Sequence, residues 1–174
     1  ATIWNDVAAL QAPGALETAA ALHRPVILMH MKGEPRTMQD DPRYDDVVTE
    51  VIDFLRARVV TAVEKGVTDI WVDPGIGFGK TLEHNLALLR NVRRIADETG
   101  RPVVIGASRK RFLGSLLADD PAQPRPVAER DAATDAVSAL AASHGVWAVR
   151  VHDVRGSRDA VRVAAAWTRG SERG

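Results

Sequence analysis

Five short runs of β-branched and other apolar residues alternate with longer segments of helical periodicity along this chain. The short runs are strand-sized and lie at residues 3–7, 25–31, 69–73, 102–107 and 146–152. The helical segments lie at residues 14–22, 44–65, 83–99, 126–144 and 157–168, and Gly66, Gly100 and Gly145 stand where three of them end. Strands that are separated by helices run parallel, with right-handed crossovers. The alternation therefore predicts an α/β fold.

The composition favours one soluble domain over residues 1–174, because 45% of the residues are hydrophobic and 26% are charged. The 23 cationic and 23 anionic side chains leave no net field, so we expect neither a nucleic acid nor a membrane as partner. The chain has no cysteine, which is compatible with a reducing compartment. Its apolar runs are too short to span a membrane, and its first residues do not resemble a secretory leader. We therefore expect a cytoplasmic protein.

Reactive side chains stand at the end of each predicted strand. They are Asn5 and Asp6, His30, Asp73, the cations after Ala107, and finally Arg150 and His152. An open doubly wound sheet and a closed (β/α)8 barrel share the same alternation of strands and helices, so alternation alone does not separate them. In barrels the catalytic groups come from the C-terminal ends of several strands around one mouth. The distribution of polar residues therefore favours a barrel with a shared site at that mouth.

A glycine-rich segment, DPGIGFGKT at residues 73–81, follows the third predicted strand. A phosphate-binding P-loop would need glycine where Pro74 stands, and a dinucleotide fingerprint would need glycine where Lys80 stands. Neither ATP nor NAD is therefore indicated. A carboxylate, Asp73, followed by three alternating glycines lets the backbone approach a flat ligand, with Phe78 beside it. The alternative is a solvent-facing turn with an incidental aspartate.

Cations follow the fourth predicted strand, in the sequence SRKR at residues 108–111. Three adjacent positive charges repel one another in open water, but they suit a site for an anionic group or a polarised carbonyl. A solvated basic turn is the alternative reading.

The fifth predicted strand brings two further polar groups together. Its period of two puts Arg150 and His152 on one face and leaves the apolar Trp147, Val149 and Val151 on the other, for packing under helices. An arginine and a histidine that project together need an anionic counterpart such as pyrophosphate. An ion pair with Asp153 is the alternative.

His30 lies between two methionines, a setting more typical of a packed core histidine than of a metal ligand. No second imidazole stands at ligand spacing, and His23, His84 and His144 have no partner pattern, so we treat them as structural or surface residues. We expect no metal ligand among the residues of this chain.

Taken together, these motifs resemble dihydropteroate synthase. They are Trp4 to Val7, Leu28 to Met31, Asp73 to Thr81 with His84 and Asn85, Gly106 to Gly114, and Arg150 to Val154, and they occur in the family's order over nearly the whole chain. The resemblance implies a (β/α)8 barrel and a transferase of folate synthesis. That enzyme joins 6-hydroxymethyl-7,8-dihydropterin pyrophosphate to p-aminobenzoate, and it releases 7,8-dihydropteroate and pyrophosphate.

The resemblance also implies a role for each matching residue. The catalytic groups would be Asp73, Lys110, Arg150 and His152. The pterin would be bound by Asn5, Met29, Asp73, Gly77, Phe78, Lys110 and Arg150, and the pyrophosphate by Arg150 and His152. The p-aminobenzoate would lie near Ser108, Arg109 and Arg111, although many family members have serine where Arg111 stands.

The loops that the family carries on its first three strands do not occur here. We therefore expect an incomplete barrel of about five C-terminal strand–helix units, which on its own lacks synthase activity. The resemblance implies Mg²⁺ for the complete enzyme, with its main ligand in one of those loops, and a homodimer formed through late helices. Two other functions stay open: a different pterin-binding barrel of the methyltetrahydrofolate-binding type, and a non-catalytic subunit or scaffold.

Overall fold

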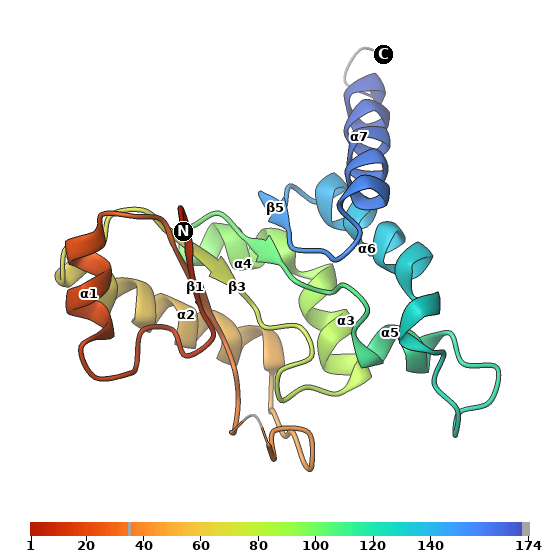
Figure 1. The fold of residues 1–174 in the computed structure, drawn as a ribbon, viewed down its shortest axis with the longest axis horizontal. Helices are drawn as coiled ribbons and strands as arrows, with labels where there is room; N and C mark the ends of the chain where they lie inside the picture. Colours follow the sequence, from red (N-terminus) through yellow and green to blue (C-terminus); the bar gives the residue numbers. More distant parts are fainter. Residues whose placement is uncertain (35, 172–174) are drawn as a thin grey trace.

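The computed structural model describes residues 1–34 and 36–171 as an α/β fold with five strands (Figure 1). Residues 35 and 172–174 of the predicted domain lie outside the described part. The strands are β1 (Trp4–Asp6), β2 (Val26–Met29), β3 (Ile70–Asp73), β4 (Val104–Ile105) and β5 (Ala148–Val149). The helices are α1 (Ala15–Leu22), α2 (Val47–Glu64), α3 (Leu82–Arg90), α4 (Val92–Thr99), α5 (Arg111–Leu116), α6 (Asp131–Ser143) and α7 (Val154–Ser171), with a 3-10 turn at Val127–Glu129.

The predicted elements are all present, but several of their boundaries differ. Each strand is shorter than its apolar run, and the helix predicted over 83–99 is divided at Asn91, whose side-chain amide donates to the carbonyl of Ala87. The helix predicted over 126–144 begins only at Asp131, after the 3-10 turn. Gly66, Gly100 and Gly145 adopt the left-handed conformation, with φ of 89°, 63° and 80°, which confirms them as helix-ending glycines.

All the strands run parallel, as the alternation predicts. β1, β2 and β3 form one ladder and β4 and β5 another. A parallel bridge between Val72 and Val103 joins the two ladders, and the Val72 amide donates to the carbonyl of Pro102 at 3.0 Å. The sheet order is therefore β1-β2-β3-β4-β5.

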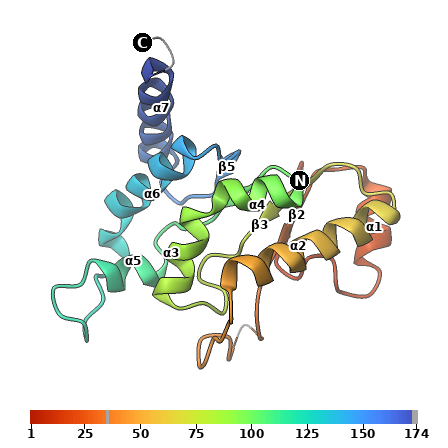
Figure 2. The same ribbon diagram turned by 180° about the vertical axis from the view of Figure 1, so that it is seen from behind.

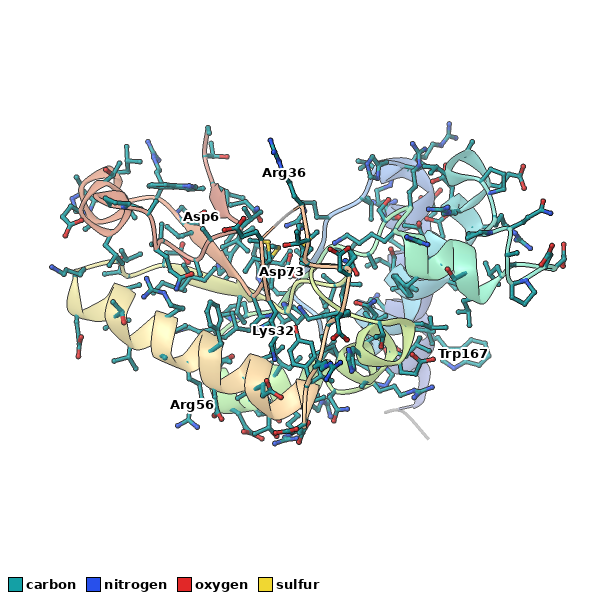
Figure 3. All side chains as sticks on the ribbon, turned by 90° about the horizontal axis from the view of Figure 1, so that it is seen from below. Asp6, Lys32, Arg36, Arg56, Asp73 and Trp167 are labelled. Carbon is teal, nitrogen blue, oxygen red and sulfur yellow. The ribbon has the colours of Figure 1, made fainter. Side chains whose placement is uncertain are left out.

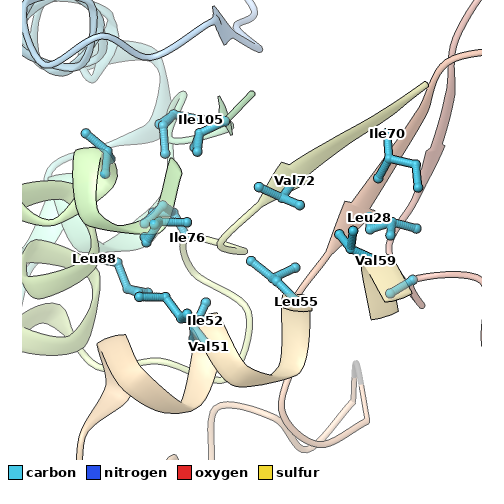
Figure 4. Packing of buried hydrophobic residues seen from close by; sticks show 14 of the residues in the cluster. Leu28, Val51, Ile52, Leu55, Val59, Ile70, Val72, Ile76, Leu88 and Ile105 are labelled. Atoms are coloured by element: carbon cyan, nitrogen blue, oxygen red, sulfur yellow. The ribbon is translucent and has the colours of Figure 1, made fainter. Parts of the chain in front are cut away.

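Helices α2, α3 and α4 cover one face of this sheet, as the two opposite views show (Figures 1 and 2). Helix α2 places an apolar side chain every three or four residues on that face, and Asp46 caps its start by accepting from the amides of Val48 and Thr49. Its buried Leu55 packs with Leu28 and Val72 of the strands (Figure 4). Burial of each such side chain stabilises the fold by about 1.5–3 kcal/mol.

The other face of the sheet carries the polar strand ends. Asn5 is in register with Ile27, and Met29 is in register with Asp73, so side chains at these positions project on the same face. Asp73 lies in the middle of the molecule, whereas Arg56 and Trp167 point outward (Figure 3).

A contact between the two ends of the chain shows that the sheet is strongly curved. Arg150, one residue beyond β5, donates from Nη1 to Oδ1 of Asn5 in β1 at 2.7 Å. In a flat sheet four strand spacings would separate β1 from β5 by about 19 Å, which is further than an arginine and an asparagine can bridge. The strands therefore form an arc with their polar ends on the inside.

The side of the sheet beyond β5 is exposed, and helix α7 lies away from the sheet. Trp147 was expected to pack under helices, but it is 54% exposed and lies against Trp71, with the ring centroids 3.9 Å apart and the ring planes tilted by 41°. β5 ends the sheet, so no further strand–helix unit among the described residues covers this side. Helix α7 packs on α6 and extends away from the sheet (Figure 1).

Within residues 1–34 and 36–171, no helix combines the length and apolarity that a membrane span requires.

Candidate functional site

An arginine and two acceptors form the centre of the site. Arg150 donates from Nη2 to Oδ2 of Asp73 at 3.0 Å and from Nη1 to Asn5. The Asp73 side chain is only 1% exposed, whereas that of Arg150 is 41% exposed. Gly106 makes this arrangement possible, because a Cβ at that position would lie 2.4 Å from Nη2 of Arg150. The guanidinium group thus lies directly against the backbone of the fourth strand.

Lys110 lies beside this centre, with its stem against the glycine-rich loop. A Cβ at Gly77 would lie 2.9 Å from Cδ of Lys110, so only glycine leaves room for the stem. The ammonium group donates to the carbonyl of Ile76 and lies 4.3 Å from the ring centroid of Phe78. Burial lowers the pKa of Lys110 to about 8; Asp73 opposes this effect, and Arg150 adds to it.

A cavity of about 290 Å³ opens between these groups. It is lined by Phe78, Gly106, Ser108, Lys110, Arg150, Val151 and His152. The cavity thus joins the ends of three strands, and three of its lining side chains are basic. An anionic group that entered it would meet cations and hydrogen-bond donors on several sides.

The backbone of the glycine-rich loop is hydrogen-bonded by side chains instead of by a neighbouring strand. Gly75, Gly77 and Gly79 have positive φ angles of 70°, 79° and 64°, which L side chains rarely adopt. The backbone groups of the loop bond to side chains instead: Gly75 N to Asp73 Oδ1 (2.7 Å), Gly77 N to Asn85 Oδ1 (2.7 Å), Gly77 O to Gln39 Nε2 (2.5 Å), Phe78 O to Lys80 Nζ (3.0 Å) and Gly79 O to Tyr44 OH (2.8 Å). The loop therefore presents Phe78 to the cavity in a fixed geometry.

Lys80, which the sequence analysis used only to exclude a dinucleotide fingerprint, is a buried part of this support. Its Nζ lies 2.9 Å from Nδ1 of the buried His30. Burial lowers the pKa of Lys80 to about 7, with Asp73 opposing and Lys110 and Lys32 adding to the effect. Burial, together with Lys80 and Lys32, lowers the pKa of His30 to about 3. His30 is therefore neutral at ordinary pH and is a packed, hydrogen-bonded histidine.

Ser108 orients His152. The Ser108 hydroxyl oxygen accepts from the backbone amide of His152 at 3.1 Å and lies 2.8 Å from Nδ1 of the same residue. Both the backbone and the ring of His152 are therefore held by the same hydroxyl group. Ser108 lines the cavity, and its hydroxyl group contacts His152 of this chain.

Arg109 and Arg111 do not reach the cavity. Arg109, with φ of 57°, makes a two-point ion pair with Asp131 at 2.7 and 2.8 Å. This hydrogen-bonded pair raises the pKa of Arg109 and lowers that of Asp131. Arg111 begins helix α5 and is exposed. Of the three residues expected near the arylamine, Ser108 therefore lines the cavity, whereas Arg109 and Arg111 lie outside it.

The predicted site residues that the structure brings together are Asn5, Asp73, Gly77, Phe78, Ser108, Lys110, Arg150 and His152. Met29 is in register with Asp73 but is fully buried. Among residues 1–34 and 36–171, no three carboxylate, imidazole or thiol side chains lie close enough to hold a metal ion.

Comparison with known proteins gives consistent matches. The family of pterin binding enzymes matches residues 1–152. The dihydropteroate synthase of Mycobacterium leprae is 46% identical over 171 residues, which are 96% of this chain and 60% of that protein.

Solved structures match as well. The dihydropteroate synthase of Yersinia pestis, in a complex with a sulfonamide drug, superposes with a TM-score of 0.89 at 38% identity over 98% of this chain and 60% of its own. The Xanthomonas albilineans enzyme in complex with 7,8-dihydropteroate superposes with a TM-score of 0.84 at 40% identity. The match covers 95% of this chain and 58% of that chain. This chain therefore spans about 60% of the length of such relatives.

The family match covers most of the chain, and it includes each strand of the sheet and the residues around the cavity. The chain therefore belongs to the family of pterin-binding enzymes.

Proposed function

We propose that this chain is the C-terminal part of a dihydropteroate synthase and contributes the pterin- and pyrophosphate-binding side of its active site. The contact of Arg150 with both Asn5 and Asp73 carries the proposal, because it draws three strand ends to one point. The relatives support it, since they carry that name at 38–46% identity.

The curvature of the sheet supports an arc of a (β/α)8 barrel. Helices α2, α3 and α4 lie on one face, the polar strand ends lie on the other, and β1 to β5 are parallel neighbours. A doubly wound sheet would carry helices on both faces. Five strands do not close a barrel of eight, so the remaining units must cover the free edges of β1 and β5.

The charges suit the proposed reaction. A dihydropterin stabilises positive charge at its exocyclic methylene as the bond to pyrophosphate breaks, and the arylamine nitrogen then forms a bond to that carbon and loses a proton. The carboxylate of Asp73 favours positive charge on the ring. Arg150 and His152 stabilise the leaving pyrophosphate, and Lys110 binds the polar edge of the pterin. Because these groups act most strongly as charge develops, they lower the barrier without a covalent nucleophile.

The p-aminobenzoate is proposed to enter near Ser108, Arg109 and Arg111. Arg109 would have to turn away from Asp131 to meet a carboxylate, whereas Arg111 is exposed. This part of the proposal therefore requires a rearrangement of the segment before α5.

Three further properties belong to the same proposal. Magnesium would need ligands from outside the described residues, which hold no suitable cluster, and we derive no step through it. A homodimer would use the apolar surface of α3, α5 and α6, where Leu116 and Leu140 are exposed. A cytoplasmic location agrees with the absence of cysteine.

A hybrid protein tests the proposal. The N-terminal part of the Mycobacterium leprae relative is fused ahead of residue 1, and formation of dihydropteroate is measured beside that of the 174-residue chain alone. We expect turnover from the hybrid only, and a loss of about 100-fold or more in kcat for the Asp73→Asn hybrid. A folded hybrid that binds no pterin pyrophosphate contradicts the function. Equal turnover by the chain alone contradicts its assignment as a part.

A further inference from the structure

The acceptors that are proposed to hold the pterin are already bound within the chain. Oδ2 of Asp73 and Oδ1 of Asn5 both accept from Arg150, and Oδ1 of Asp73 accepts from the Gly75 amide. A guanidinium group and the 2-amino-pyrimidinone edge of a pterin have the same N–C–N arrangement of N–H donors. The two groups therefore offer equivalent hydrogen bonds to the same oxygen atoms.

We propose that the pterin and Arg150 compete for Asn5 and Asp73, and that the diphosphate of the substrate compensates Arg150 for the bonds it gives up. The site would thereby select the pyrophosphate ester over the unphosphorylated alcohol. This inference rests on the proposed function and adds a specificity role to Arg150, which is otherwise only a cation along the pterin and beside the leaving group.

The burial of the partners determines which of them moves. Asp73 is 1% exposed and is fixed by the Gly75 amide, so its carboxylate stays in place. Arg150 is 41% exposed and already lines the cavity, so its guanidinium can turn away from Asp73 while its stem stays where it is. The exchange needs no backbone movement.

The surroundings explain why the displaced arginine needs an anion. The cavity into which it turns is also lined by Lys110 and His152, and the positive charges of Arg150 and Lys110 repel each other. A bare pterin alcohol takes the carboxylate from Arg150 and leaves Arg150 and Lys110 without an anionic partner. A diphosphate on the same pterin accepts from both, so the exchange becomes favourable.

The exchange makes a thermodynamic prediction that needs no variant. Pyrophosphate draws Arg150 away from Asp73, so it should strengthen the binding of the pterin alcohol, and the alcohol should strengthen the binding of pyrophosphate by the same factor. Calorimetric titration of 6-hydroxymethyl-7,8-dihydropterin, with and without saturating pyrophosphate, measures this coupling on the chain and on the hybrid. We expect about a tenfold decrease in Kd.

The Arg150→Met variant gives the second measurement, because methionine keeps an apolar stem and removes the donors. We expect the alcohol to bind about tenfold tighter than to the parent and the pyrophosphate ester about tenfold weaker, and we expect the coupling to disappear. Changes of the same sign for both ligands, or independent binding of alcohol and pyrophosphate to the parent, overturn the inference and leave the proposed function standing. A parent that binds no pterin contradicts the proposed function itself.

Discussion

The buried Lys80 should make the stability of the fold depend on pH in a way that one substitution removes. Lys80 is 4% exposed, and among the described residues its ammonium group bonds to the Phe78 carbonyl and to neutral His30. Burial lowers its pKa from 10.5 to about 7. Lys80→Met fills a similar volume with an apolar side chain and removes the titrating group.

The sign of the effect follows from the proton balance. Below pH 7 Lys80 is charged in the folded and the unfolded chain, and the cost of its burial is fully present. Between pH 7 and pH 10.5 the unfolded chain binds a proton that the folded chain lacks, so the free energy of unfolding rises with pH. One proton corresponds to about 1.4 kcal/mol per pH unit, or roughly 5 kcal/mol over the interval as an upper bound.

Urea unfolding of the parent and of Lys80→Met, followed by circular dichroism from pH 6 to pH 10, measures this difference. Lys110, whose pKa is about 8, titrates in both proteins, so only the difference between the two curves is interpreted. Lys65→Met serves as the matched control, because the Lys65 side chain is 54% exposed. We expect the advantage of Lys80→Met to shrink as pH rises. Parallel curves for the two proteins would refute the burial argument.

Four further substitutions test the structure. Gly75→Ala should cost more than about 3 kcal/mol in urea unfolding, because its Cβ would lie 1.8 Å from the His30 carbonyl oxygen at a φ of +70°. Gly14→Ala, at a φ of +75° with no neighbour within 4 Å, should cost only about 1–2 kcal/mol, and equal losses would contradict the close contact. Leu55→Ala should cost about 2–5 kcal/mol in the same assay, since Leu55 is fully buried under the sheet, and a smaller loss would argue against that packing. Asp131→Ala should cost about 1 kcal/mol or less, because its ion pair is one-third exposed, and a loss of several kcal/mol would mean that the pair is buried by other parts of the protein.

The order of the elements was predictable because strand-sized apolar runs and helix-ending glycines are local signals. The convergence of polar strand ends followed from parallel topology, since all C-terminal ends lie at one edge. Lys110 and Arg150 therefore line one cavity, and Asp73 accepts a hydrogen bond from Arg150 beside it. The curvature of the sheet was not readable from periodicity; the bond between Arg150 and Asn5 is what distinguishes an arc from a flat sheet among the described residues.

The contacts that hold the site residues in position were less predictable than the site residues themselves. Lys80 is buried against His30, a contact between residues that are 50 positions apart. The pairing of Arg109 with Asp131 likewise depends on where helix α6 begins, and the run of cations alone gave no sign of it. Long-range contacts of this kind leave no periodic pattern in a sequence.

The two sides of the proposed site are unequally complete in this chain. The side chains that hydrogen-bond the glycine-rich loop come from Gln39, Tyr44, Lys80 and Asn85, and the proposed acceptors for the pterin are Asn5 and Asp73, all within the described residues. On the arylamine side, by contrast, Arg109 is held by Asp131 and Arg111 is exposed. If the proposed function holds, pterin binding should therefore survive in the isolated chain better than turnover does, because the proposed pterin acceptors lie within this chain and the proposed arylamine side would need a rearrangement.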